Sequence, residues 1–391
     1  MNRITPIAIL AALCLFIACG SDSASTPKGP PQPIKVEDRI WNTTDVFPRQ
    51  AWEVRSPESQ GVNPRALDKA LKELASFSGE DGIGEVVVIR NGYLIHQGEN
   101  ASKRHNLYSC TKSFASMTLG LMLADRRCRL QDSAFYFSPL LRQKYRNAQL
   151  FHFTTMTSGY DGMGTSRFND LKSQDWSLAP YAPADPLFAP GTAFAYWDEA
   201  QMMFGRVLTR AAREDLKEML QLRVMGPIAL GEWDWQIEGS LGAVPIRSGA
   251  TGIEMNALQL ARIGWLYLNR GRWGSRQLLP PDFVEQATMN QVPVNLPLAD
   301  TDRKDIDGRG AYGFNWWVNG VSTGAVASMP DTPAQTFYMS GFNNNMCFVI
   351  PEWNMVFVRT GMDGNPGQGP KYQLYNRVFK ELAKGVKESA S

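Results

Sequence analysis

The sequence predicts an α+β fold in which one antiparallel sheet, flanked by terminal helices, carries a mostly helical insertion. Strand-like apolar runs occur near both ends of the chain, while the stretch from about 110 to 330 shows helical patterns and long Gly-, Pro- and Trp-rich loops. Because this middle stretch has no clear strand run, we expect the two ends to share one sheet of about five or more strands.

The first predicted elements are a helix and a hairpin. Asn63 is placed to cap a helix that starts at Pro64, and apolar residues then recur at helical spacing. Those residues are Leu67, Ala70, Leu71 and Leu74. Glu85–Arg90 and Tyr93–Gln97 read as strands joined by an Asn91–Gly92 turn, a pair typical of a type I′ hairpin.

The last predicted elements are three strands and a helix. The strands are Thr336–Met339, Met346–Ile350 and Met355–Arg359. The helix is predicted from an apolar stripe formed by Tyr375, Val378, Phe379, Leu382 and Val386. The sheet subdomain would therefore comprise about 51–108 and 330–388, with the helical insertion at about 109–329.

Composition excludes several classes of protein. The 391 residues include 40 Lys+Arg and 38 Asp+Glu, a net charge of +2 that does not suit a nucleic-acid-binding protein. Only 3 His and 5 Cys are present, scattered along the chain, so a metal site is not expected. Cys110, Cys128 and Cys347 form no C-x-x-C pattern, and a bridge between two of them stays open at this point.

The N-terminus has the pattern of an export signal. Arg3 precedes an apolar run from Ile7 to Ala18 that is too short to span a bilayer comfortably. Residues Phe16–Gly20 resemble the bacterial lipoprotein cleavage box, which implies a signal peptide of 1–18, lipid on Cys19 and a flexible tether of 19–50. We expect an anchor at the outer membrane facing the periplasm. The alternative is an ordinary secretory signal with an incidental Cys.

Ser109 is the candidate nucleophile. It lies three residues before Lys112, at the head of a helix that carries no charge from Ser113 to Ala124 and should be buried. Residues three apart share a helix face, and the helix N-terminus favours negative charge on the Ser109 oxygen. Burial would lower the pKa of Lys112 and let it accept the Ser109 proton. The alternative is a chance occurrence of S-x-x-K.

Further motifs occur in an order that resembles the serine β-lactamase and penicillin-binding-protein superfamily, specifically the class C β-lactamase-like hydrolases. The motifs are Gly92, Ser109-x-x-Lys112-Ser113, Thr157–Gly159, Pro190–Thr192 with Tyr196, Met255–Gly274 and Tyr312–Trp317. The resemblance spans about Trp52 to Val386. It implies a β-lactamase/transpeptidase-like fold for a hydrolase domain at 51–388. The group includes esterases, D-amino-acid peptidases and 6-aminohexanoate-dimer hydrolases, and needs no metal or cofactor.

The resemblance also implies roles for individual residues. Ser109 would be acylated, Lys112 would accept its proton, and Tyr196 would shuttle a proton to the leaving group. A tyrosine with its usual pKa of about 10 is a poor base at neutral pH, and a neighbouring Lys⁺ would lower that pKa. The oxyanion hole would combine the main-chain N–H of Ser109 with one near Phe342.

Two departures from the family pattern bear on the substrate. Asp198 replaces the Asn of the Y-x-N motif, and a carboxylate beside Lys112 would raise the pKa of the Lys and keep it charged. The third motif is best matched by Met339-Ser340-Gly341, where Met339 replaces a cation. Neutral esters or amides therefore fit better than β-lactams or D-Ala peptides. The competing hypothesis is a surface binding lipoprotein with weakened catalysis.

The remaining candidates have weaker support. Tyr160, Trp197, Trp316, Phe342 and Asn343 could line a substrate pocket, although aromatic residues dominate cores anyway. A dyad of Ser109 with His105 is the less favoured alternative, because no G-x-S-x-G elbow surrounds Ser109. His96 and His152 read as structural.

Overall fold

The computed structural model describes residues 39–41, 44–78, 81–163, 179–299, 306–321, 327–362 and 371–387. The predicted signal peptide, Cys19 and most of the tether lie outside these ranges. Within them, no helix is both long enough and apolar enough to cross a membrane.

The central element is a six-stranded antiparallel sheet with the order β12-β13-β14-β15-β1-β2. Its strands are β1 (Val86–Arg90), β2 (Tyr93–Gln97), β12 (Trp317–Val318), β13 (Phe337–Gly341), β14 (Asn345–Ile350) and β15 (Met355–Arg359). β1 pairs with β15 along its whole length, from Val86 opposite Arg359 to Arg90 opposite Met355. The predicted antiparallel sheet, built from both ends of the chain, is confirmed.

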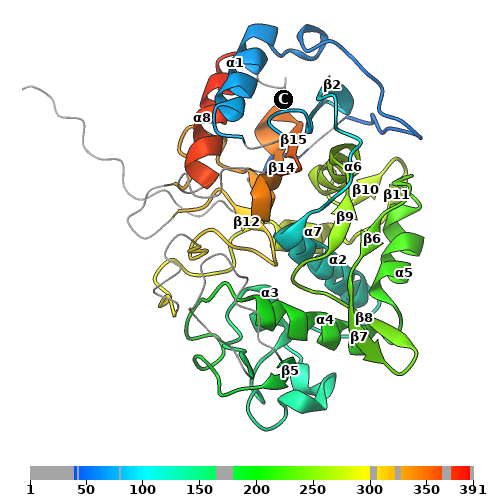
Figure 1. Cartoon of the computed structure of the whole chain (residues 1–391), viewed down its shortest axis with the longest axis vertical. Helices are drawn as coiled ribbons and strands as arrows, with labels where there is room; N and C mark the ends of the chain where they lie inside the picture. Colours follow the sequence, from blue (N-terminus) through cyan, green and yellow to red (C-terminus); the bar gives the residue numbers. More distant parts are fainter. Residues whose placement is uncertain are drawn as a thin grey trace, which may run out of the picture. The chain divides into compact units, whose positions relative to one another are not determined.

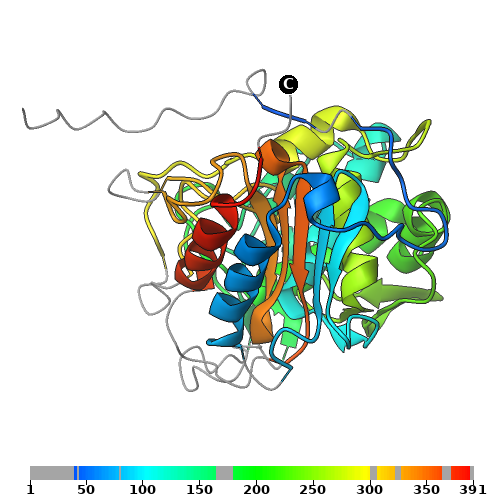
Figure 2. The ribbon, with the colours of Figure 1, turned by 90° about the horizontal axis from the view of Figure 1, so that it is seen from above.

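Helices cover both faces of this sheet. α1 (Pro64–Ala75) and α8 (Lys371–Ala383) lie side by side on one face (Figures 1 and 2). Asn63 caps α1 as predicted, because its side chain accepts a hydrogen bond from Arg65 N. α6 (Ala257–Leu268) packs against β14, β15 and β1. Alternate strand residues serve the two faces, so Phe357 joins the α1/α8 core and Val358 joins the larger core on the other side.

The middle of the chain forms the remaining helices and several short strands. The helices are α2 (Thr111–Ala124), α3 (Leu150–Thr154), α4 (Asp198–Ala212), α5 (Leu216–Leu220) and α7 (Pro281–Ala287). β3 (His105–Asn106), β9 (Ile253–Met255) and β6 (Asp234–Trp235) form a three-stranded sheet. Three two-stranded ribbons pair β4 (Gly162–Met163) with β5 (Ala179–Pro183), β7 (Ile237–Leu241) with β8 (Val244–Arg247), and β10 (Arg272–Trp273) with β11 (Arg276–Gln277).

The expectation of a middle without strands is therefore wrong. The strands concerned are two to five residues long, and β7 has no buried residue, so they leave no apolar alternation in the sequence. Two elements from the range of the predicted insertion also belong to the sheet layer. β12 extends the sheet beside β13, and α6 covers one of its faces.

The described cysteines form no bridge. Cys110, Cys128 and Cys347 are all buried free thiols, so the disulfide left open by the sequence does not form. Burial raises the pKa of the Cys128 thiol to about 12, as expected for a small apolar residue rather than a reactive one.

Candidate active site

Ser109 lies in a 3-10 turn, Tyr108–Cys110, that leads directly into α2. Tyr108 has a φ of 47°, a left-handed conformation that costs a non-glycine residue about 1–2 kcal/mol. Asn106 holds this turn, because its Oδ1 accepts hydrogen bonds from Tyr108 N at 2.8 Å and from Gly252 N at 3.3 Å. A strained turn fixed by a buried loop is a common device for presenting a reactive side chain.

Lys112 is the second residue of α2 and is 1% exposed. Its Nζ donates to Ser109 Oγ at 2.9 Å and to the main-chain oxygen of Ala250 at 3.0 Å, and forms an ion pair with Asp198 Oδ1 at 2.6 Å. An ammonium has three protons and no acceptor capacity, so toward these oxygens Lys112 can act only as a donor or as the positive partner of an ion pair. Lys112 is therefore arranged as a hydrogen-bond donor to Ser109.

The electrostatics of Lys112 agree with this geometry. Burial lowers the pKa of Lys112, but the charges and hydrogen bonds of Asp198 and Tyr196 outweigh burial and raise the pKa above its ordinary value. This is the effect expected from Asp at position 198. The amine is consequently protonated at neutral pH, and the expectation that burial makes Lys112 a neutral base is wrong for the resting site.

Tyr196 lies two residues before α4 and is also buried. Its ring is 5.0 Å from Lys112 Nζ and stacks on Trp317 with a centroid distance of 5.5 Å. Burial raises the pKa of Tyr196, and hydrogen bonding to Ser109 and the charge of Lys112 offset this only in part. The expected lowering of the Tyr196 pKa by Lys⁺ is thus outweighed, and the resting phenol keeps its proton.

The Asp198→Asn variant should move the alkaline limb of the pH–rate profile to lower pH by about one unit or more. Without the carboxylate, burial becomes the dominant influence and lowers the pKa of Lys112, so the donor to Ser109 deprotonates earlier. In the wild type that pKa is raised, so the ion pair contributes stability at neutral pH and loses it as pH rises through the folded-state pKa. The measurement is kcat/KM against pH.

The matched control for this experiment is Asp68→Asn, which removes the carboxylate of an exposed pair with Lys72 on α1, 2.8 Å apart. Its profile should match the wild type. An unmoved alkaline limb in Asp198→Asn would contradict the coupling between Asp198 and Lys112.

The end of β13 touches the nucleophile turn. A Cβ placed on Gly341 would lie 2.1 Å from Leu107 O, so only glycine allows the strand to approach this closely. Phe342, which follows, is 49% exposed, and its ring meets Tyr108 edge-on at 5.4 Å. Ser340 is half-buried, whereas Met339 is 1% exposed and packs in the core. The structure therefore puts a core side chain, not a cation, at position 339.

Gly341→Ala should reduce kcat by at least about tenfold and destabilise the fold by about 1–3 kcal/mol. The added methyl forces β13 away from Leu107 and with it the turn beside Ser109. Gly242→Ala is the control, because a Cβ there meets nothing within 4 Å, while its φ of 65° strains an alanine, so this variant should lose stability and keep kcat. Steady-state kinetics and thermal unfolding of both variants test this; equal kcat in Gly341→Ala and wild type would contradict it.

Three of the aromatic side chains considered for the substrate pocket are core residues. Trp316 is fully buried against Tyr267, with ring centroids 4.4 Å apart. Tyr160 is 1% exposed and its hydroxyl donates to Pro180 O at 2.6 Å. Trp197 is buried and donates to Asp161 Oδ1 at 3.3 Å. Asn343 is buried in the turn after β13.

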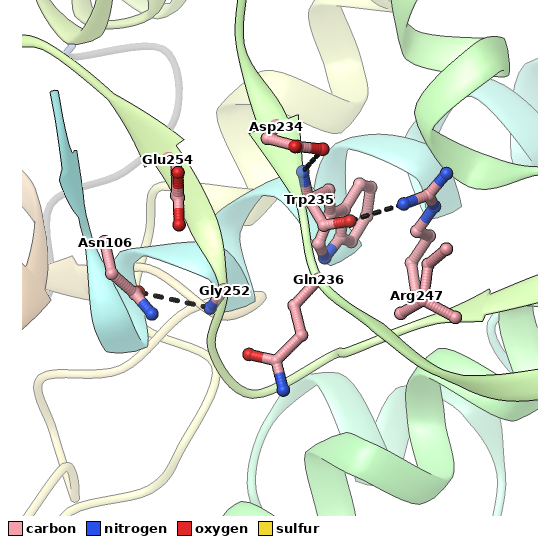
Figure 3. A pocket seen from close by; sticks show the side chains of 8 residues that line it. Asn106, Asp234, Trp235, Gln236, Arg247, Gly252 and Glu254 are labelled. Carbon is pink, nitrogen blue, oxygen red and sulfur yellow. Dashed lines mark hydrogen bonds between the residues drawn. The ribbon is translucent and has the colours of Figure 1, made fainter.

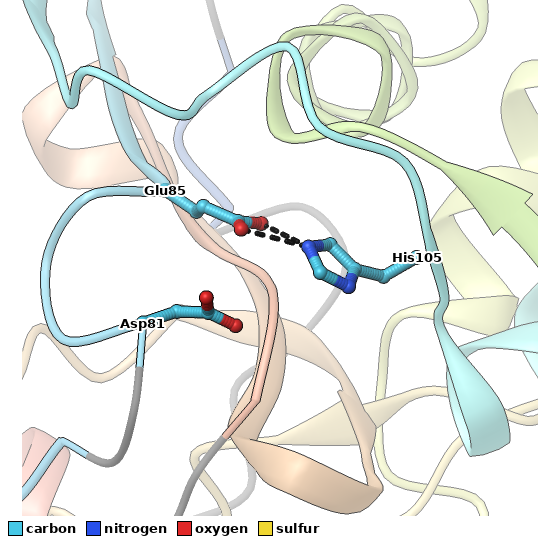
Figure 4. A group of neighbouring side chains, drawn as sticks. All are labelled: Asp81, Glu85 and His105. Atoms are coloured by element: carbon cyan, nitrogen blue, oxygen red, sulfur yellow. Dashed lines mark hydrogen bonds and ion pairs between the residues drawn. The ribbon is translucent and has the colours of Figure 1, made fainter.

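His105 is engaged away from Ser109. Its Nε2 lies 2.7 Å from the buried carboxylate of Glu85, with Asp81 beside them (Figure 4). Ligand atoms of these three residues lie within 4.8 Å of one another, a spacing that could suit a cation. The Lys103 ammonium already places a positive charge there, because its Nζ is 3.2 Å from Asp81 and 3.8 Å from Glu85. His96 lies in β2, and His152 caps α3, as structural residues do.

Asn315 was not identified from the sequence as a site residue, yet it ties together α2 and α4, the two helices of the candidate site. Its Nδ2 donates to Lys112 O at 3.2 Å in α2 and to Gln201 Oε1 at 2.6 Å in α4. Its own main-chain oxygen accepts from Ser113 Oγ at 2.7 Å. These contacts fix the spacing of α2 and α4, which carry Lys112 and Asp198. The Tyr312–Trp317 motif contained the only sequence signal.

A pocket of about 330 Å³ adjoins the nucleophile turn (Figure 3). Asn106 and Gly252 form part of its wall, so the same hydrogen bonds that hold Tyr108 shape the pocket. Its remaining lining residues are Asp234, Trp235, Gln236, Ile237, Arg247 and Glu254. They come from β6–β9, the short strands that the sequence pattern did not predict.

The antiparallel sheet with its flanking helices, and S-x-x-K at the head of a buried helix, define the class: a β-lactamase/transpeptidase-like fold with a serine site. The profile of the Beta-lactamase family matches residues 82–373. The chain therefore belongs to the Beta-lactamase family, a family of hydrolases, and the predicted resemblance is confirmed.

Individual relatives are distant. A Beta-lactamase from Pseudomonas fluorescens is 24% identical over 123 residues, which span 31% of this chain and about a third (34%) of that relative. A structure described as a 6-aminohexanoate-dimer hydrolase from Bacillus anthracis has 18% identity and a TM-score of 0.63, covering 88% of this chain and 89% of that one. EstCE1, a hydrolase with promiscuous acyltransferase activity, has 18% identity and a TM-score of 0.59, covering 81% and 99%. These likenesses confirm the fold.

Proposed function

We propose that the protein is a serine hydrolase that cleaves an ester or amide through an acyl-enzyme on Ser109. One observation carries the proposal: Ser109 Oγ, the Lys112 ammonium and Asp198 form a chain of contacts at 2.9 and 2.6 Å, with Tyr196 over the Lys. A serine hydroxyl needs a positioned proton-transfer partner and charge stabilisation to become a nucleophile, and this cluster offers both.

The protonated states of Lys112 and Tyr196 favour a proton relay through Tyr196 over a mechanism in which either residue is already deprotonated and acts as a base. In the first step Ser109 Oγ attacks the substrate carbonyl, its proton passes to Tyr196 Oη, and the Tyr196 proton passes to the leaving oxygen or nitrogen. The Lys112 ammonium stabilises the negative charge that develops on Ser109 Oγ. Water then releases the acyl group by the same relay in reverse. Because Tyr196 gives a proton as it takes one, its raised pKa is compatible with this role.

The substrate class follows from position 339. A cation there would bind a substrate carboxylate, and here Met339 is in the core instead. We therefore propose neutral esters or amides in preference to β-lactams or D-amino-acid peptides, whose carboxylates would lack that partner. EstCE1 and a family VIII carboxylesterase with 13% identity and a TM-score of 0.59, covering 85% of this chain and 99% of that one, lend support by analogy.

A substrate panel tests this proposal. The purified domain should hydrolyse p-nitrophenyl acetate or butyrate with kcat/KM at least about 10-fold above that for nitrocefin. A fluorophosphonate should label Ser109, located by peptide mass spectrometry. A higher kcat/KM for nitrocefin than for the esters would contradict the proposed substrate class. Absence of both labelling and turnover would contradict the proposal that the protein is a serine hydrolase.

The second candidate is a surface binding lipoprotein that keeps the fold with weakened catalysis. It is favoured by the core position of Met339 and by the charge held on Lys112. If it is correct, the wild type is inactive and Asp198→Asn with Met339→Lys creates activity. Robust wild-type ester turnover excludes it.

Export and lipid anchoring remain proposals from the N-terminal sequence. We propose that the protein is held by lipid on Cys19 at the outer membrane, facing the periplasm. Incorporation of labelled palmitate into the full-length chain, and its loss in Cys19→Ala, would support this; an unlabelled wild type would favour the ordinary secretory signal.

A further inference from the structure

The turn that follows β13 has an unusual conformation. Asn343 and Asn344 have φ values of 57° and 61°, so two consecutive non-glycine residues are left-handed. Left-handed backbone is strained for residues other than glycine, so a turn of this kind persists only where its surroundings enforce it. The turn connects Gly341, which touches Leu107, to Asn345 at the start of β14.

All three carbonyl oxygens of the turn are held from the protein interior. Asn345 Nδ2 donates to Phe342 O at 2.7 Å. Arg359 Nη1 donates to Asn343 O and, at 3.4 Å, to Asn344 O. The same guanidinium donates to Gly361 O and Met362 O on the segment behind the turn.

Arg359 is the last residue of β15 and is fully buried. Among the residues that the structure describes, its guanidinium makes no ion pair, and its acceptors are four main-chain carbonyls. Burying a cation without a carboxylate is unfavourable, and an apolar side chain would fill the same space at a lower cost in free energy. The two Nη atoms of the rigid fork gather the carbonyl oxygens, while Nε has no hydrogen-bond partner among the described residues.

The direction of these carbonyl groups also sets the direction of the N–H group in each of the same peptides. A trans peptide directs its N–H away from its C=O. With Phe342 O taken by Asn345, the N–H of Asn343 points away from the interior. The N–H of Asn345 closes the turn on Phe342 O. The N–H groups of Asn343 and Asn344 are therefore the ones that this turn can offer to an oxyanion hole, and their direction is set by what holds the Phe342 and Asn343 carbonyls.

We propose that Arg359 is a positioning residue that holds the Phe342–Asn344 turn so that its main-chain N–H groups face the oxyanion formed at Ser109. The inference rests on the proposed hydrolase function and adds a residue with no contact to the substrate. It assigns a role to a buried cation that the family resemblance did not single out.

The test compares Arg359→Met and Arg359→Lys with Arg262→Met. Arg262 is a matched control, since it is 3% exposed and also donates to main-chain carbonyls, those of Ile228, Gln50 and Pro48. Arg359→Met should lower kcat about 100-fold, the scale of losing one oxyanion donor, with KM within about threefold of wild type. Arg359→Lys, which keeps part of the donor set, should lower kcat about 10-fold. Arg262→Met should lose stability but keep kcat.

A boronic acid, which forms a tetrahedral adduct with an active serine, gives a readout that stability alone does not move. Its affinity should fall in Arg359→Met in proportion to kcat and stay unchanged in Arg262→Met. If Arg359→Met does not fold, Arg359→Lys and Asn345→Ala decide, the latter because it removes the side-chain hydrogen bond to Phe342 O and leaves only the main-chain N–H of residue 345 to hold it. Those two variants should each lose about 10-fold in kcat.

Two outcomes overturn the inference. One is kcat within about threefold of wild type in the folded Arg359 variants; the other is an equal loss of kcat and boronate affinity in Arg262→Met. Failure of the proposed function looks different, because Ser109→Ala would then remain active. An inactive Ser109→Ala beside a fully active Arg359→Met overturns the positioning role alone.

Discussion

Ser109→Ala should lower ester turnover by at least about 10⁴-fold and abolish labelling by a fluorophosphonate. In the proposed reaction the Ser109 hydroxyl is the group that forms the acyl bond. Its oxygen accepts a hydrogen bond from the Lys112 ammonium at 2.9 Å. The backbone should not change, because Ser109 is half-buried and its hydroxyl contacts Lys112 and Tyr196 within the site. Turnover and labelling, measured on folded protein, check this.

Ser116→Ala supplies the control. Ser116 is a fully buried serine on the same helix, and its hydroxyl has no partner among the described residues, so its removal should leave turnover near the wild-type value. Full turnover by Ser109→Ala would remove the nucleophile from the proposal, and a comparable loss in Ser116→Ala would point to a damaged helix instead.

Lys112→Met should lower kcat by about 10³-fold and destabilise the fold by about 3 kcal/mol. Methionine matches much of the side-chain volume but donates no hydrogen bond, so Ser109 loses its charge stabilisation. Ala250 O and the Asp198 carboxylate lose their partner at the same time. Steady-state kinetics and denaturant unfolding measure the two losses separately.

The double variant Lys112→Met with Asp198→Asn separates catalysis from stability. Neutralising Asp198 removes the stranded carboxylate, so stability should recover while activity stays low. Recovery of activity along with stability would mean that Lys112 serves the fold and not the reaction.

The sequence predicted those elements of the fold that depend on residues close together in the chain. The Asn63 cap, the Asn91–Gly92 turn and the strands near the C-terminus each follow from neighbouring residues, and the structure confirms them within one or two residues. The short strands of the middle region could not be predicted, because β3 to β11 are two to five residues long and carry little apolar alternation, and β3 pairs with β9, a strand distant in sequence.

The candidate site, too, could be predicted only in part from the sequence. Spacing alone placed Lys112 beside Ser109, and the nature of residue 198 indicated the raised pKa of Lys112. The third acceptor of Lys112 could not be predicted, since Ala250 comes 138 residues later. The raised pKa of Tyr196 depends on burial by Trp317 and its neighbours, which only tertiary structure reveals. Arg359 gave no signal, because an arginine ending an apolar strand looks like a solvent-exposed charge.

The pairing of β1 with β15 has a consequence for how the chain folds. β1 hydrogen-bonds on one side to its local hairpin partner β2 and on the other to a strand that ends at Arg359. The chain must lose the conformational entropy of closing this long loop before the β1–β15 hydrogen bonds can form. We therefore expect this topology to fold slowly. During synthesis the N-terminal hairpin and α1 wait with one sheet edge and one apolar face uncovered until β15 and α8 emerge. The N-terminal hairpin and α1 are therefore most exposed to aggregation in the interval before β15 and α8 have been synthesised and packed.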